Sequence, residues 1–211
     1  MTKKYVQYGC GNSAPKEWTN FDVSPTLRIQ KTPIIGAILR SQLNTTFPSN
    51  VLYGDIIKGL PVDDNSCDGL YCSHTLEHLS LQDFRQALRN SYKVLKKDGI
   101  FRCIVPDLEF SARSYIKALE NGDNLASFNF FDTTLLGKKE RPRGLKGFLS
   151  TFIGNSHHLW MWDAKSLAEE LKNAGFTQIR VCKFNDSEDE MFKHVEDIKR
   201  FEDAAAIECR K

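Results

Sequence analysis

The chain has 211 residues, 41% of them hydrophobic and 27% charged, which is ordinary for one globular domain and excludes a largely disordered protein. The 29 Lys and Arg residues nearly balance the 27 Asp and Glu residues, so the net charge gives no general attraction to nucleic acid or to an anionic membrane. No apolar run approaches the ~18 residues of a membrane-spanning helix. We therefore expect a cytoplasmic protein, with its six cysteines reduced and mostly buried because none forms a C-x-x-C pair.

Short apolar runs alternate with segments of helical periodicity, a pattern typical of an α/β fold with a mostly parallel sheet. Seven runs predict strands, at residues 5–8, 19–23, 51–57, 67–73, 100–105, 177–184 and 204–209. The last two are joined without a long crossover, so we expect an antiparallel edge strand.

Three segments predict helices between these strands. The clearest begins at Ser80, whose side chain and that of Asp83 can form an approximate capping box, and continues to Gly99. Another begins after Asp163, and an amphipathic pattern predicts a helix over 191–201. A helical or irregular stretch is also expected around 34–39.

Residues 107 to about 156 interrupt the alternation and are interpreted as an insertion within a single domain that spans 1–211. Helical spacing over 108–119 is followed by an aromatic patch formed by Phe128, Phe130 and Phe131. The loop 138–146 contains five positive residues against one negative residue. We interpret this loop as a solvated surface, with phosphate binding as the alternative.

Polar and glycine residues follow the first three strands, where ligands bind in open α/β folds. Gly9-Cys10-Gly11 allows backbone N–H groups to approach a ligand, although a tight turn explains the pair equally well. Asp22 could accept hydrogen bonds from both hydroxyls of a ribose, or cap a turn. Asp55 could accept from an adenine amine while Ile56 packs on the ring.

With these residues in order, the chain resembles the class I S-adenosylmethionine-dependent methyltransferases, and in particular a bacterial subfamily of predicted methyltransferases. The further matching segments are LPVDDNSCD, SHTLEHL, LKKDGIFRCIVPDLE and HLWMWDAKSLAEELKNAGF. The resemblance implies a Rossmann-like fold with seven strands, helices on both faces of the sheet, and S-adenosylmethionine as the cofactor.

The resemblance also implies a role for each matching position. Gly9, Cys10, Gly11 and Asn12 would line the methionine part of the cofactor, Asp22 would hold the ribose, Asp55 and Ile56 would meet the adenine, and Ser73 and His74 would approach the sulfonium. The glycine motif lacks its later glycine, and Asp22 follows Gly11 after only 22 − 11 = 11 residues. A full crossover helix does not fit in that interval, so we expect a short turn or loop containing Pro15.

The candidate catalytic residues are a histidine and an aspartate. His158 is the first candidate, as a base or a ligand of the substrate, with capping of the next helix as the alternative; Asp107 is the second. His74-Thr75-Leu76-Glu77-His78 also satisfies H-x-x-E-H, an inverted zinc-protease motif. That motif requires both histidines on one helix, whereas the predicted helix begins only at Ser80, so no metal is expected.

The function expected from these observations is methyl transfer to a small polar acceptor, such as a sugar or another metabolite. The alternative is a non-catalytic methyltransferase-like domain that binds a partner or regulates one. No nucleic-acid partner is expected, because no RNA-binding module is appended.

Overall fold

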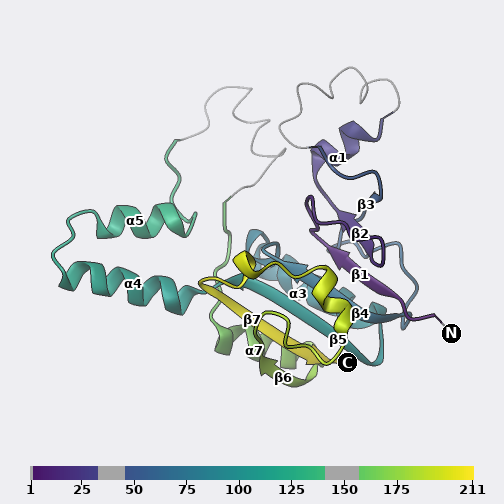
Figure 1. Ribbon diagram of the computed structural model, residues 1–211. Helices are drawn as coiled ribbons and strands as arrows, with labels where there is room; N and C mark the ends of the chain where they lie inside the picture. The colour runs from purple at the N-terminus through teal and green to yellow at the C-terminus, as the bar shows by residue number, and fades with distance from the viewer. Residues whose placement is uncertain (1, 33–45, 141–156) are drawn as a thin grey trace.

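In the computed structural model, residues 2–32, 46–140 and 157–211 are described. Seven strands form one sheet in the order β3-β2-β1-β4-β5-β7-β6 (Figure 1). They are β1 (Tyr5–Tyr8), β2 (Thr19–Asp22), β3 (Val51–Tyr53), β4 (Cys67–Ser73), β5 (Leu95–Pro106), β6 (Thr177–Val181) and β7 (Ala204–Arg210). The first five strands are parallel, and β7 runs antiparallel to both β5 and β6. The predicted mostly parallel, seven-stranded fold is confirmed, with the antiparallel strand beside the edge strand β6.

The connection from β1 to β2 is a short loop, as predicted. The two strands are parallel neighbours with Val6 opposite Thr19, and residues 9–18 between them contain only turns and irregular backbone. A buried amide pair takes the place of a crossover helix: the Gln7 side chain donates to Asn20 at 2.5 Å, and Asn20 in turn donates to the carbonyl of Pro15 at 3.0 Å. These hydrogen bonds pair the buried side-chain amides of Gln7 and Asn20 with partners inside the protein.

One face of the sheet is covered by α3 (Leu81–Val94) and α7 (Ala164–Asn173), whose apolar stripes share a core with the strands. Phe84 of α3 stacks on Trp162, just before α7, with ring centroids 4.2 Å apart. Side-chain caps at Ser80 and Asp163 fix where the two helices begin. The cap at Ser80 includes a hydrogen bond to Asp83, as predicted.

The opposite face is covered by short 3-10 turns, so the predicted amphipathic helix over 191–201 is wrong. The segment forms η3 (Glu190–His194) and η4 (Ile198–Arg200). The Asp197 side chain accepts from the backbone N–H of Lys199 and so begins a new turn inside the expected helix. Phe192 is fully buried against Trp18 and Tyr71, so the apolar residues still cover the sheet.

Two further boundaries differ from the prediction. α3 ends at Val94 and not near Gly99, because Leu95 already pairs with Cys67 as the first residue of β5; tertiary strand pairing overrides the helical pattern there. The third strand ends at Tyr53, because residues 55–59 form a tight turn closed by a bridge. The stretch 34–39 and the loop from residue 141 onward lie outside the described residues.

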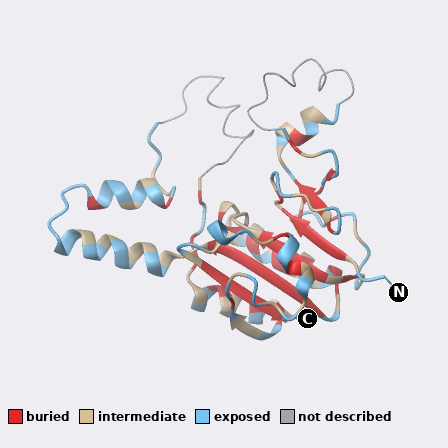
Figure 2. Ribbon diagram, viewed as in Figure 1, coloured by how far each residue is buried: buried red, intermediate tan, exposed pale blue. Residues whose placement is uncertain are grey.

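A helical hairpin projects from the sheet after β5 (Figure 1). It consists of α4 (Leu108–Glu120) and α5 (Ala126–Thr133), and most of its surface is exposed (Figure 2). Tyr115 and Phe130 meet between the helices at 5.5 Å, whereas Phe128 and Phe131 of the aromatic patch are more than half exposed. The hairpin occupies the first part of the expected insertion.

A shorter helix, α1 (Pro25–Gln30), follows β2 and buries Leu27. All six cysteines are buried and unpaired. Among the helices of the described residues, none has the length and apolar character needed to cross a membrane.

Candidate functional site

The loop after β1 is built on two glycines in the left-handed region, Gly9 at φ +63° and Gly11 at φ +54°. A Cβ on Gly9 would lie 2.0 Å from the hydroxyl of Thr75, whereas a Cβ on Gly11 would meet nothing within 4 Å. Gly9 is therefore needed for close packing of this loop on the segment after β4. Gly11 leaves open space beside the backbone.

Asp22, at the end of β2, holds that loop in place. Its carboxylate accepts from the backbone N–H groups of Gly11 at 2.9 Å and Ser24 at 2.8 Å, and the residue is buried. Both carboxylate oxygens are thus engaged within the fold, and Asp22 is not among the residues that line the cavity beside this loop. Its contact with a ribose stays a prediction.

A cavity of about 440 Å³ lies beside the loop and is called the cofactor cavity below. It is lined by predicted cofactor residues (Gly9, Cys10, Gly11, Asn12 and Ser73) and by a group from the C-terminal turns (His194, Val195, Glu196, Asp197 and Arg200). Two lining hydroxyls, of Tyr71 and Ser73, are buried without a hydrogen-bond partner. Unpaired buried hydroxyls are costly, so the cavity suits a polar ligand of the size of S-adenosylmethionine.

Two predicted adenine-binding residues lie outside this cavity. Ile56 is buried in the core under α3. The Asp55 carboxylate accepts from the N–H of Ile57 at 3.0 Å and contacts Lys58 at 3.5 Å. The structure thus gives both residues local roles in the turn after β3, and their contact with adenine stays a prediction.

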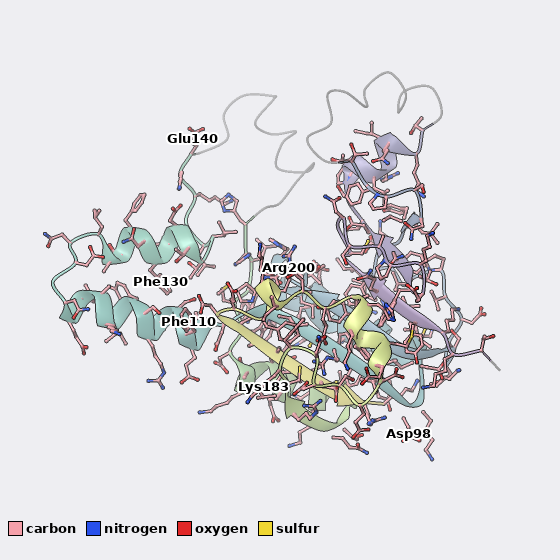
Figure 3. All side chains as sticks on the ribbon, viewed as in Figure 1. Asp98, Phe110, Phe130, Glu140, Lys183 and Arg200 are labelled. Carbon is pink, nitrogen blue, oxygen red and sulfur yellow. The ribbon has the colours of Figure 1, made fainter. Side chains whose placement is uncertain are left out.

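A second, larger cavity of about 610 Å³ lies between the helical hairpin and the carboxyl ends of β4 and β5, and is called the acceptor cavity below. Phe110 and Phe130 line it from the two helices, and Arg200 lines it from the sheet side (Figure 3). Arg200 also lines the cofactor cavity, so the two cavities are neighbours. Of the aromatic patch named from the sequence, only Phe130 reaches the acceptor cavity.

Glu77 forms the polar centre of the acceptor cavity, although sequence analysis assigned it no role. It is fully buried in the turn η2 (Leu76–His78), and neither carboxylate oxygen has a hydrogen-bond partner within the described parts of the chain. Three imidazoles surround its Oε1 atom: His74 Nδ1 at 3.7 Å, His158 Nε2 at 3.9 Å and His78 Nε2 at 4.0 Å. These distances are too long for hydrogen bonds.

Burial decides the charge states in this cluster. It raises the pKa of Glu77 to about 8 and lowers the pKa of His158 to about 4. Burial also lowers the pKa of His74. His158 is therefore neutral near pH 7, and its contact with Glu77 is not an ion pair.

His158 lies next to Glu77 because the backbone fixes it there. The N–H groups of Leu159 and Trp160 both donate to the Glu77 carbonyl, at 2.8 and 3.2 Å. The His158 side chain faces the acceptor cavity and packs edge-on against His78 at 5.0 Å. The helix cap that was the alternative role for His158 is supplied by Asp163 instead.

Asp107 and His74 complete the predicted set. The Asp107 carboxylate caps α4 by accepting from the N–H of Glu109 at 2.8 Å, and the residue lines neither cavity. His74 lines the acceptor cavity at φ +49°, a left-handed conformation that is uncommon for a side chain with a Cβ. The catalytic role of Asp107 stays a prediction.

Residues 6–103 match the family model described as a methyltransferase domain. No curated protein matches the chain. Among solved structures, a possible histamine N-methyltransferase from Thermotoga maritima is 20% identical with a TM-score of 0.53, covering 100% of this chain and 83% of its own.

Two further solved structures are similar at 16% identity. A putative methyltransferase in complex with the Trm112 activator from Haloferax volcanii has a TM-score of 0.51, covering 99% of this chain and 82% of its own. A SAM-dependent methyltransferase from Archaeoglobus fulgidus has a TM-score of 0.50, covering 99% and 86%. At these sequence identities the similarity shows a shared fold and nothing more specific.

Proposed function

We propose that this chain, whose residues 6–103 match a methyltransferase-domain model, uses S-adenosylmethionine to methylate a small polar acceptor bound in the acceptor cavity. The observation that carries the proposal is the adjacency of two cavities at the carboxyl edge of the sheet, which share Arg200. Methyl transfer requires a donor and an acceptor site within reach of each other.

On the donor side, the chain supplies a glycine loop and unpaired polar groups. When bound, S-adenosylmethionine supplies an activated methyl group on its sulfonium. The backbone of the loop at Gly9 and Gly11 lines the cofactor cavity, and the lining hydroxyls of Tyr71 and Ser73 have no hydrogen-bond partner among the described residues. Asp22 holds the loop through the N–H of Gly11, so it would act on the ribose and on the loop together.

On the acceptor side, the lining is both aromatic and polar. Phe110, Tyr115 and Phe130 offer ring faces, while Ser111 and Asn129 offer hydrogen-bonding groups. Such a mixture suits a small molecule with an apolar face and several hydroxyl groups, such as a sugar or a related metabolite. The hairpin would close over this molecule and exclude water.

We assign His158 to holding the acceptor and not to removing its proton. A pKa lowered to about 4 makes the imidazole a weak base near pH 7. The same neutral ring can accept a hydrogen bond from an acceptor hydroxyl.

Calorimetric titration with S-adenosylhomocysteine, the demethylated product, tests the donor site. Gly11→Val should abolish measurable binding, because the side chain would enter open space beside the cofactor loop. Gly122→Val is the matched control, since Gly122 also has a positive φ and an open Cβ position but lies in the hairpin, away from this loop. No binding by the unaltered chain would favour the non-catalytic alternative.

Transfer of a radiolabelled methyl group from S-adenosylmethionine to a panel of sugars, sugar phosphates and amines tests the acceptor class. A labelled sugar is the expected product. Labelled amines alone would contradict the sugar assignment, and absence of transfer to any compound despite cofactor binding would contradict a small polar acceptor.

A further inference from the structure

The cluster at Glu77 has a feature that the proposed methyl transfer does not explain. A buried carboxylate without any hydrogen-bond donor is costly, and here its nearest neighbours are three ring nitrogens. One ligand atom each from Glu77, His78 and His158 lies within 4.8 Å of the others. The cluster faces the acceptor cavity, so a ligand can reach it.

The ring nitrogens that face Glu77 carry lone pairs and not protons, because the opposite nitrogens face outside acceptors. His78 Nδ1 contacts the carbonyl of His157 at 3.1 Å, and His74 Nε2 contacts the carbonyl of Arg200 at 2.9 Å. His158 Nδ1 lies 3.2 Å from the sulfur of Met161. Assigned from these partners, each N–H points outward and each lone pair points toward the carboxylate.

Lone pairs that converge on a carboxylate repel one another unless a proton or a metal cation lies between them. Metal-bound histidines typically donate their other N–H to a backbone carbonyl, which fixes the ring orientation. The His78 contact with the His157 carbonyl has this form. Two imidazoles and one carboxylate are also a common ligand set for zinc in enzymes, with one position left open.

We propose that Glu77, His78 and His158 bind a divalent transition-metal ion, with Zn²⁺ as the expected ion, in the wall of the acceptor cavity. Donors on a tetrahedral zinc lie roughly 3.3 Å apart, given bonds of about 2.0–2.1 Å. The observed contacts of 3.9 and 4.0 Å to Glu77 therefore need to shorten by only about 0.6 Å. The ligand atoms of His78 and His158, which lie within 4.8 Å of each other, must also approach. Hydrogen bonds to the Glu77 carbonyl already hold the backbone after His158 beside Glu77 and His78.

The ion would have an open coordination position toward the cavity, where all three ligands are lining residues. One carboxylate and two neutral imidazoles leave the site with a net charge of +1, which favours an oxygen ligand such as a hydroxyl or a carboxylate. This part of the inference rests on the proposed function: the metal would hold the acceptor by its oxygen atoms. Metal binding itself does not depend on methyl transfer.

Metal uptake by untagged, full-length protein tests the proposal without any enzyme assay. After treatment with a chelator and desalting, the protein is titrated with Zn²⁺ by calorimetry and with Co²⁺ by visible absorption. One equivalent of each ion should bind, and the cobalt form should show d–d bands. Absence of stoichiometric binding by the unaltered protein would overturn the proposal.

Matched variants locate the site. Glu77→Gln and His158→Gln should each weaken Zn²⁺ binding about 100-fold or more, since even outer-shell changes at metal sites cost 10–100-fold. His157→Gln is the control, because its ring contacts the Leu135 carbonyl, outside the cluster, and its own carbonyl is kept; its affinity should stay within about twofold. Equal losses in His157→Gln and His158→Gln would overturn the assignment.

Circular dichroism checks that the variants fold. If His158→Gln does not fold, Glu77→Gln still tests the site, because glutamine preserves the volume of the glutamate side chain. S-adenosylhomocysteine binding is measured separately on the same samples. Protein that binds zinc but not this product refutes the proposed function and supports the metal site. Protein that binds the product but no zinc does the reverse.

Discussion

The clusters of buried charged groups around Arg102 and around Glu77 differ in whether their members are paired. Arg102, fully buried on β5, contacts Glu208 at 2.6 Å, Asp186 at 3.0 Å and Glu196 at 2.7 Å. The contact with Glu196 is an ion pair without an aligned hydrogen bond. In the other cluster, Glu77 is as deeply buried, but its carboxylate has no hydrogen-bond partner among the described residues, and the nearby cation Arg200 acts on it without forming an ion pair.

The difference separates structural from functional burial of charge. A buried charge is tolerated when its partner is built into the fold, as in the Arg102 cluster. Where no partner is built in, the charge is compensated by a ligand, a proton or an ion. The Glu77 cluster opens on a cavity, which allows a ligand to supply what the fold does not.

Replacing Arg102 should have the largest effect. Arg102→Met leaves the carboxylate of Glu196 buried without its cation, while Glu208 keeps its pair with Arg180, so the free energy of unfolding should fall by about 3–5 kcal/mol. Urea denaturation measures the change. Arg113→Met is the control: its pair with Glu109 is exposed, and its loss should cost less than about 1 kcal/mol. Equal effects of the two substitutions would show that the Arg102 cluster does not stabilise the fold.

Replacing Glu77 should have the opposite sign in metal-free protein. Glu77→Gln gives the surrounding imidazoles an N–H donor, so the free energy of unfolding should rise by about 1 kcal/mol. With saturating Zn²⁺ the order should reverse, because only the unaltered protein gains stability from the bound ion. Urea denaturation with chelator and with zinc gives both values. A loss of stability in chelator would mean that the carboxylate has a partner within the fold.

Two tyrosines extend the comparison to neutral groups and should show the smallest effects. Tyr8 shares a buried hydrogen bond with Ser91 at 3.1 Å, whereas the Tyr71 hydroxyl is buried without a partner. Tyr8→Phe should cost about 1 kcal/mol of unfolding free energy, and Tyr71→Phe close to none.

Because Tyr71 lines the cofactor cavity, Tyr71→Phe should instead weaken binding of S-adenosylhomocysteine several-fold, as measured by calorimetry. Tyr8 also lines this cavity, but its hydroxyl is bonded to Ser91, so Tyr8→Phe should change that affinity less than Tyr71→Phe does. A substantial loss of stability in Tyr71→Phe, with unaltered binding, would place the hydroxyl in the fold and not in the site.

Much of the fold could be predicted because its determinants are local. The alternation of apolar runs and helical spacing indicated the seven strands, and Ser80 and Asp163 indicated where two helices begin. The short interval between Gly11 and Asp22 excluded a crossover helix, and the structure has a loop there. Predictions were wrong where a distant strand or a local side-chain cap competed with periodicity, as at Leu95 and at Asp197.

The candidate site was predicted only in part, because some of its residues lie at the ends of strands and others lie in buried positions that the sequence does not mark. The glycine loop and Ser73 follow directly from strand ends, and they line one cavity. Asp55 and Ile56 were chosen by the same logic, yet the turn after β3 directs them to local contacts and to the core. The unpaired hydroxyl of Tyr71 had no signal in the sequence, since an aromatic residue in a buried strand is ordinary.

What the sequence determined by itself is the order of elements and the glycine turn at the edge of the sheet, because residues close in the chain fix these. It also contains His74, Glu77 and His78 at the spacing of a zinc motif, but the predicted helix begins only at Ser80, and this argued against a metal. Only the tertiary structure decided that His158 joins Glu77 and His78, since hydrogen bonds from Leu159 and Trp160 to the Glu77 carbonyl join segments about 80 residues apart. Ligands that meet across such a distance carry no local spacing, and the chain must fold before they meet.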